Sequence, residues 1–83
     1  MSYLYLILMM NKIPVTITYE GKSYTGSLDE VAGAGASTWH LMIENYYWGR
    51  LRKVGDEWMF DESKYKVSEW TDYLAGVVIS WYQ

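Results

Sequence analysis

The sequence contains no cysteine, one histidine and one proline among its 83 residues. Without cysteine the chain can form neither a disulfide nor a thiolate-ligated metal site, and the sequence does not indicate whether its compartment is oxidising or reducing. With a single histidine, structural zinc is effectively excluded, because such sites are built from cysteine and histidine. An apolar core must therefore stabilise the fold, and 51% hydrophobic with 18% aromatic residues can supply one. The length predicts a single domain over residues 1–83.

Positive charge is also scarce, since 7 Lys and Arg stand against 10 Asp and Glu, for a net charge of −3. Nucleic-acid binding is disfavoured, because neutralising phosphates requires an excess of Lys and Arg. The charges are unevenly distributed: a basic cluster at residues 50–53 precedes the acidic residues Asp56, Glu57, Asp61, Glu62, Glu69 and Asp72. This asymmetry suits an anionic ligand or a self-complementary interface, and solvated strand ends explain it equally well.

The longest apolar run, YLYLILMM, occupies residues 3–10. It is too short to span a membrane and lacks the basic region and cleavage site of a signal peptide, so we expect a cytoplasmic protein without a membrane partner. Residues 1–10 are either an extension upstream of a natural start at Met9 or Met10, or an extra strand of the domain's own sheet or of a neighbour's. We favour the strand, because an exposed run of this kind would aggregate. It predicts a domain-swapped or edge-paired homodimer.

Antiparallel hairpins are predicted over residues 13–61. Apolar and polar residues alternate from Ile13 to Tyr19, which indicates a half-buried strand, and Glu20-Gly21 forms a two-residue turn. This turn pairs Ile17 with Tyr24, Val15 with Gly26 and Ile13 with Leu28. Further strands are expected over residues 38–43, 47–54 and 57–61, with a second two-residue turn at Gly55-Asp56.

Two registers are open for the connection between residues 43 and 47. A three-residue connection at 44–46 brings Tyr47 opposite Ile43 and Leu51 opposite Trp39. A two-residue turn at Glu44-Asn45 would instead bury Trp48 and Arg50, and an unpaired buried arginine is costly. We favour the first register, which predicts a core face made of Trp39, Leu41, Ile43, Tyr47, Leu51, Trp58 and Phe60.

A C-terminal amphipathic helix is predicted over residues 69–82, with Ser68 as its N-cap. Its apolar stripe consists of Trp70, Tyr73, Leu74, Val77, Val78 and Trp81. Gly76 interrupts this pattern and predicts close backbone packing against the sheet. The fold class is α+β: a strongly bent antiparallel sheet or small SH3-like barrel of five to six strands, packed by this helix. The likeness to SH3-like barrels is one of architecture only.

No motif indicates catalysis or a cofactor. The stretch VAGAGAST at residues 31–38 lacks the lysine of a phosphate loop, and a strand follows it where a dinucleotide site needs a helix. Ser37 and His40, three apart on a strand, point to opposite faces and cannot form a catalytic pair. We therefore expect no enzyme, no cofactor and no metal site.

The face of the sheet opposite the core carries the candidate binding residues. The residues expected there are His40, Met42, Trp48, Arg50, Arg52 and Met59. Exposed tryptophan, methionine and arginine are typical of an interface hot spot. The sequence predicts a small non-catalytic module that binds a protein partner or a second copy of itself. The alternatives are a barrel that binds single-stranded nucleic acid through Trp48, Arg50 and Arg52, or an enzyme that uses His40.

Overall fold

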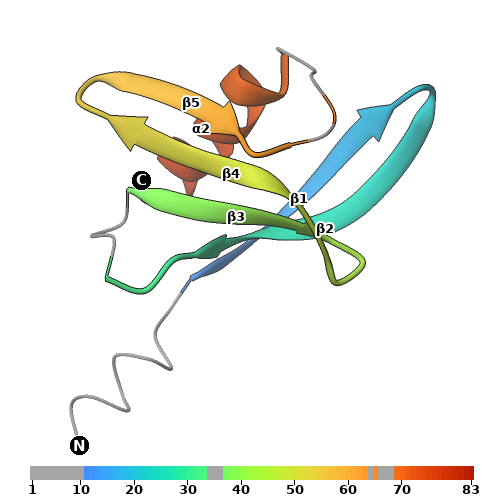
Figure 1. The fold of residues 1–83 in the computed structure, drawn as a ribbon, viewed down its shortest axis with the longest axis horizontal. Coiled ribbons are helices and arrows are strands. Elements are labelled where there is room, and N and C mark those ends of the chain that lie inside the picture. The colour runs from blue at the N-terminus through green and yellow to red at the C-terminus, as the bar shows by residue number, and fades with distance from the viewer. Residues whose placement is uncertain (1–10, 34–36, 64, 66–68) are drawn as a thin grey trace, which may run out of the picture.

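The computed structural model describes residues 11–33, 37–63, 65 and 69–83 (Figure 1). Its elements are β1 (Lys12–Tyr19), β2 (Lys22–Glu30), β3 (Thr38–Ile43), β4 (Tyr46–Val54), β5 (Glu57–Asp61) and α2 (Glu69–Trp81). The strands form one antiparallel sheet in the order β1-β2-β3-β4-β5. This sheet curls into a half-barrel, and α2 lies on one side of it. The predicted fold class is confirmed, with five strands. The predictions for residues 1–10 and for Ser68 lie outside the described residues.

The two glycine-containing turns fix their hairpins as predicted. Glu20 and Gly21 have φ angles of 51° and 78°, the positive values that a two-residue type I′ turn requires. The resulting pairs are Ile17 with Tyr24, Val15 with Gly26 and Ile13 with Leu28. In the β4–β5 hairpin Leu51 lies opposite Phe60, and Lys53 lies opposite Trp58. Both registers place the apolar residues on the face that contacts α2.

The β3–β4 hairpin differs from the prediction. Glu44 and Asn45 form a two-residue turn with φ angles of 53° and 71°, and Ile43 lies opposite Tyr46. A β-bulge in β4, opposite the step from Leu41 to Met42, then shifts the register by one residue. Trp39 consequently still lies opposite Leu51, as predicted. The bulge removes the cost that argued against the shorter turn, because it keeps the arginine after it out of the core.

The bulge also moves two aromatic residues to faces other than the predicted ones. Tyr47 lies opposite Met42 on the face away from α2 and is 40% exposed, so its assignment to the core was wrong. Trp48 packs against the core instead. The next residue has to be small, because a Cβ on Gly49 would collide with the ring of Phe60. Glycine at this position therefore permits the bulge.

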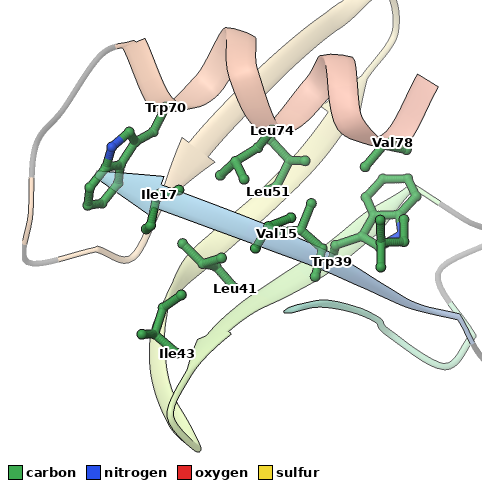
Figure 2. Close-up of a cluster of buried hydrophobic side chains, with 11 residues drawn as sticks. Val15, Ile17, Trp39, Leu41, Ile43, Leu51, Trp70, Leu74 and Val78 are labelled. Atoms are coloured by element: carbon green, nitrogen blue, oxygen red, sulfur yellow. The ribbon is translucent and has the colours of Figure 1, made fainter. Parts of the chain in front are cut away.

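The core lies between the sheet and α2 (Figure 2). Its buried residues are Ile13, Val15, Ile17, Leu28, Trp39, Leu41, Ile43, Leu51, Trp70, Leu74 and Val78. The helix stripe is narrower than predicted, since Tyr73 and Trp81 are 43% and 46% exposed while Ala75 is buried. The prediction for Gly76 was wrong: the residue is exposed, and no atom lies within 4 Å of where its Cβ would be. No helix in the described part of the chain is long and apolar enough to cross a membrane.

Candidate functional site

The face of the sheet that points away from α2, called the outer face here, carries a row of polar residues across all five strands. Lys12 of β1 lies opposite Asp29, Asp29 opposite His40, His40 opposite Arg50 and Arg50 opposite Asp61. Directly opposed side chains on one face of an antiparallel sheet are close enough to interact. Opposite charges meet at both ends of the row. Lys12 Nζ lies 3.5 Å from Asp29 Oδ2, and Arg50 Nε lies 3.0 Å from Asp61 Oδ1.

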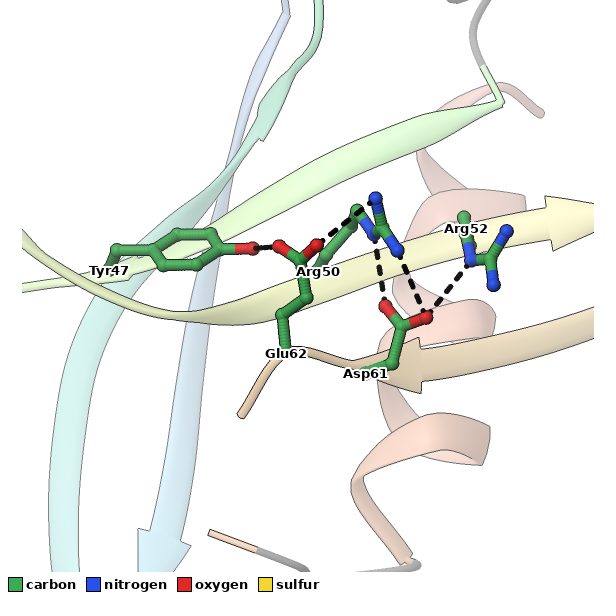
Figure 3. A network of polar contacts seen from close by, with 5 residues as sticks. All are labelled: Tyr47, Arg50, Arg52, Asp61 and Glu62. Atoms are coloured by element: carbon green, nitrogen blue, oxygen red, sulfur yellow. Dashed lines mark hydrogen bonds and ion pairs between the residues drawn. The ribbon is translucent and has the colours of Figure 1, made fainter. Parts of the chain in front are cut away.

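The strongest polar contacts of the outer face converge on Asp61 (Figure 3). Arg50 donates two hydrogen bonds to this carboxylate, from Nε to Oδ1 at 3.0 Å and from Nη2 to Oδ2 at 3.1 Å. Arg52 Nε donates a third to Oδ2 at 3.1 Å. The fork of the Arg50 guanidinium matches the carboxylate, which fixes the orientation of both groups. One carboxylate thus holds two arginines from the neighbouring strand.

A second carboxylate, Glu62, extends this network toward Tyr47. The Tyr47 hydroxyl donates a hydrogen bond of 2.5 Å to Glu62 Oε1, and Arg50 Nη1 lies 3.3 Å from Glu62 Oε2. Partial burial and the hydrogen bond to Glu62 raise the pKa of Tyr47 to about 12. Tyr47 is therefore a neutral hydrogen-bond donor at physiological pH. The two arginines are already matched by two carboxylates, so the cluster offers little net positive charge.

Acid should weaken this network, so the loss of stability caused by Asp61→Asn should depend on pH. The hydrogen bond from Arg50 holds the pKa of the Asp61 carboxyl below its ordinary value of 3.8, against the opposing effect of burial. A carboxyl with a lowered folded-state pKa stabilises the fold above its unfolded pKa, and this contribution is lost as pH falls through the folded value. We expect Asp61→Asn to lower the free energy of unfolding by about 1 kcal/mol at neutral pH. The deficit should shrink below about pH 4.

Urea denaturation at neutral pH and below about pH 4 measures this difference in the free energy of unfolding. Asp56→Asn, in the exposed β4–β5 turn, is the matched control and should change little at either pH. A deficit of equal size at neutral and acid pH would contradict the role given to the Asp61 carboxylate.

Apolar side chains lie beside this charged cluster. Tyr47 is 40% and Met59 is 39% exposed, and Met42 lies half-buried opposite Tyr47. The ring of His40 meets that of Tyr47 edge-on, with centroids 4.9 Å apart. Five of the six predicted binding residues therefore share the outer face. These five are His40, Met42, Arg50, Arg52 and Met59.

The sixth, Trp48, does not lie with them, and its predicted place on the outer face was wrong. Its ring centroid lies 5.1 Å from that of Tyr24, 4.8 Å from that of Tyr65 and 5.9 Å from that of Trp70. The β4 bulge turns the side chain into this aromatic cluster on the α2 side of the sheet. A tryptophan packed in this way offers no free ring face beside the arginines on which a nucleotide base could stack.

Sequence reasoning missed three members of the site: Tyr47, Asp61 and Glu62. The signal for Asp61 was present, because extending the register of the Gly55-Asp56 turn past Phe60 sets Asp61 opposite Arg50. Tyr47 could not be found in the same way. The face on which the Tyr47 side chain lies depends on the β4 bulge, and no turn residue in the sequence predicts that bulge.

His40 and the carboxylates are the side chains of the described residues that metal ions most often bind. None of their His, Asp and Glu side chains form a group of three or more that could hold a metal ion. His40 packs against Tyr47 on the outer face, whereas other residues line the grooves that the described residues form beside α2. An imidazole in this position can take part in a hydrogen bond at the surface. No protein-family model, curated protein or solved structure matches this chain, so its function has to be inferred from its own residues.

Proposed function

We propose that this chain is a small non-catalytic interaction module of the cytoplasm that binds a protein partner through its outer face. The observation that carries the proposal is the combination of a hydrogen-bonded charged cluster with apolar side chains on one partly exposed surface. Asp61 holds Arg50 and Arg52 in place, and Met42, Tyr47 and Met59 lie beside them. Oriented arginines next to tyrosine and methionine are characteristic of the residues that dominate protein interfaces.

A protein suits this surface better than a nucleic acid does. Phosphate binding needs arginines with uncompensated charge, and here Asp61 and Glu62 compensate them. Base stacking needs an exposed aromatic ring beside the arginines, and Trp48 is turned to the other side. Tyr47 is the aromatic residue beside them, and its hydroxyl is bound to Glu62 while its ring meets that of His40 edge-on. A protein partner can instead accept hydrogen bonds from the remaining guanidinium N–H groups, donate one to the Tyr47 hydroxyl oxygen, and cover the methionines.

The substitution Met59→Asp tests the proposal. The full chain, Met59→Asp and Ile79→Asp are immobilised and used to capture proteins from the host lysate, and the captured partner is then purified for calorimetry. Ile79, 48% exposed on α2, is the matched control for Met59 at 39%. We expect Met59→Asp to weaken the measured affinity at least about tenfold, because a charge is then desolvated at the contact, while Ile79→Asp leaves it unchanged.

Two results would contradict the proposal. One is a partner that both variants bind equally well. The other is salt-sensitive binding of a single-stranded oligonucleotide that Arg50→Ala abolishes, which would favour the nucleic-acid alternative.

A further inference from the structure

One long edge of the sheet has backbone groups without strand partners in the described chain. Among the described strands, β1 is first in the sheet order and has β2 as its single partner. The two-residue turn makes Tyr19 and Lys22 a hydrogen-bonded pair, and the hydrogen-bonded positions then alternate along β1 through Ile17, Val15 and Ile13. The residues between them point their backbone groups away from β2. These residues are Lys12, Pro14, Thr16 and Thr18.

Two grooves run between this edge and α2. One of about 590 Å³ is lined by Ile13, Pro14, Val77 and Trp81 among others. The other, of about 290 Å³, is lined by Thr16, Ile17, Thr18 and Trp70 among others. Both include Tyr73, so together they follow β1 along most of its length. An extended segment that paired with the edge would place every second side chain in these grooves.

The chain itself carries a segment with matching length and chemistry. The apolar run at residues 3–10 has eight residues, as has β1. We propose that residues 3–10 of a second copy add to the β1 edge as an antiparallel strand, and that the exchange is reciprocal around a twofold axis at Asn11. This surface is separate from the outer face, so the inference stands independently of the proposed protein partner.

The register follows from the symmetry. With the axis at Asn11, the paired residue numbers of the two copies sum to 22, so 10, 8, 6 and 4 lie opposite 12, 14, 16 and 18. These are the positions of β1 whose backbone groups point outward. Each half of the interface loses one hydrogen bond, because Pro14 has no N–H to donate.

The same register directs apolar side chains into the grooves. Residues 3, 5, 7 and 9 then lie opposite the inward-facing Tyr19, Ile17, Val15 and Ile13. Tyr5 enters the groove beside Ile17 and Trp70, and Met9 enters the one beside Ile13 and Val77. Each groove combines apolar and aromatic side chains with one carboxylate, Asp72 or Glu69, and the apolar part suits these occupants.

The position of Asn11 favours exchange between copies over pairing within one chain. Asn11 continues β1 in line: its carbonyl accepts a hydrogen bond of 2.9 Å from the Glu30 amide. Its side chain donates to Glu30 Oε1 at 3.0 Å and accepts from Trp81 Nε1 at 3.2 Å. For residues 3–10 to pair with β1 of their own chain, the chain would have to reverse its direction before Asn11. A two-residue turn at residues 8–9 satisfies the register, and the rest of the apolar run, residues 3–7, then reaches no farther than Pro14. Within one chain, the apolar run would therefore leave the edge at Thr16 and Thr18 open.

A single introduced cysteine tests the axis directly, because the natural chain has none. In Asn11→Cys the two copies of residue 11 would form a non-hydrogen-bonded pair with Cα atoms about 4.5 Å apart, within disulfide range. We expect mild oxidation to convert this full-length variant to a covalent dimer. Ser23→Cys, exposed on β2, is the matched control and should stay largely uncrosslinked. Equal crosslinking of the two variants would overturn the proposal.

Sedimentation of full-length variants tests the edge and the groove. The unmodified chain should have twice the chain mass of 9.8 kDa. Thr16→Pro removes an outward N–H without breaking a bond to β2, and Ile7→Asp places a charge opposite the buried Val15; both should yield monomers. Met59→Asp, on the outer face, should remain dimeric. A monomeric unmodified chain, or a dimer that persists in folded Thr16→Pro and Ile7→Asp, would overturn the strand exchange and leave the outer-face proposal untouched.

Discussion

Replacing Gly26 with alanine should lower the free energy of unfolding by about 3 kcal/mol or more, the upper range for overpacking a core. Gly26 lies in the middle of β2, between Val15 and Ile43 of the neighbouring strands. A Cβ at this position would collide with the backbone carbonyl oxygen of Met42 and lie 2.7 Å from the Ile43 Cδ1 atom. A flexible side-chain tip can move aside, whereas a backbone carbonyl of the adjacent strand cannot move without distorting the sheet.

The matched control is the same substitution on the helix. Gly76→Ala meets no atom within 4 Å and replaces a poor helix former, so it should raise the free energy of unfolding by up to about 1 kcal/mol. Urea denaturation followed by circular dichroism measures both variants. The signs should be opposite. A Gly26→Ala chain as stable as the unmodified one would show that β2 and β3 do not approach as closely as described.

Removing Trp70 should have a comparable or larger effect. Trp70 is 4% exposed, and its ring centroid lies 5.7 Å from that of Tyr19, 5.9 Å from that of Trp48 and 6.2 Å from that of Phe60. Trp70→Ala deletes the centre of this cluster at the start of α2 and should cost about 3–5 kcal/mol. A domain of this size has only about 5 kcal/mol in total, so much of the variant should be unfolded at room temperature.

Two further variants separate loss of packing from loss of helix. Trp70→Phe keeps an aromatic ring and should cost clearly less than Trp70→Ala. Ile79→Ala, on the exposed side of α2, should stay within about 0.5 kcal/mol of the unmodified chain. The measurement is again urea denaturation followed by circular dichroism. A loss below about 1 kcal/mol for Trp70→Ala would contradict the packing of α2 on the sheet.

How far the sequence predicts the sheet depends on the turns. Gly21 and Gly55 mark two-residue turns, and both of their hairpins pair as expected. The β3–β4 turn has no glycine: Glu44 and Asn45 adopt positive φ themselves. The free-energy cost of burying an unpaired arginine favoured the longer connection, because the short turn followed by a strand without a bulge would have buried Arg50. The molecule combines the short turn with a bulge, a solution that depends on the space next to Phe60 and hence on tertiary packing.

The membership of the candidate site could be predicted wherever the pairing of the strands was predicted correctly. His40, Met42, Arg50, Arg52 and Met59 share a face because strand alternation holds on both sides of the bulge. Only the residues at the bulge exchange places. The pairing of Arg50 with Asp61 follows from a local turn, whereas the aromatic partners of Trp48 come from β2, α2 and the segment between β5 and α2. Contacts of that range leave no local pattern in the sequence.

The strand order also determines which contacts carry the largest entropic cost of loop closure during folding. Every strand pairs with its neighbour in the chain, so each hairpin closes only a short loop. The contacts of Asn11 with Trp81 and Tyr82 instead join residues 70 and 71 positions apart. Closing so long a loop costs more entropy than closing a hairpin, which places it late in folding. The hairpins can thus assemble one by one, and the two ends of the described chain meet when α2 docks on β1.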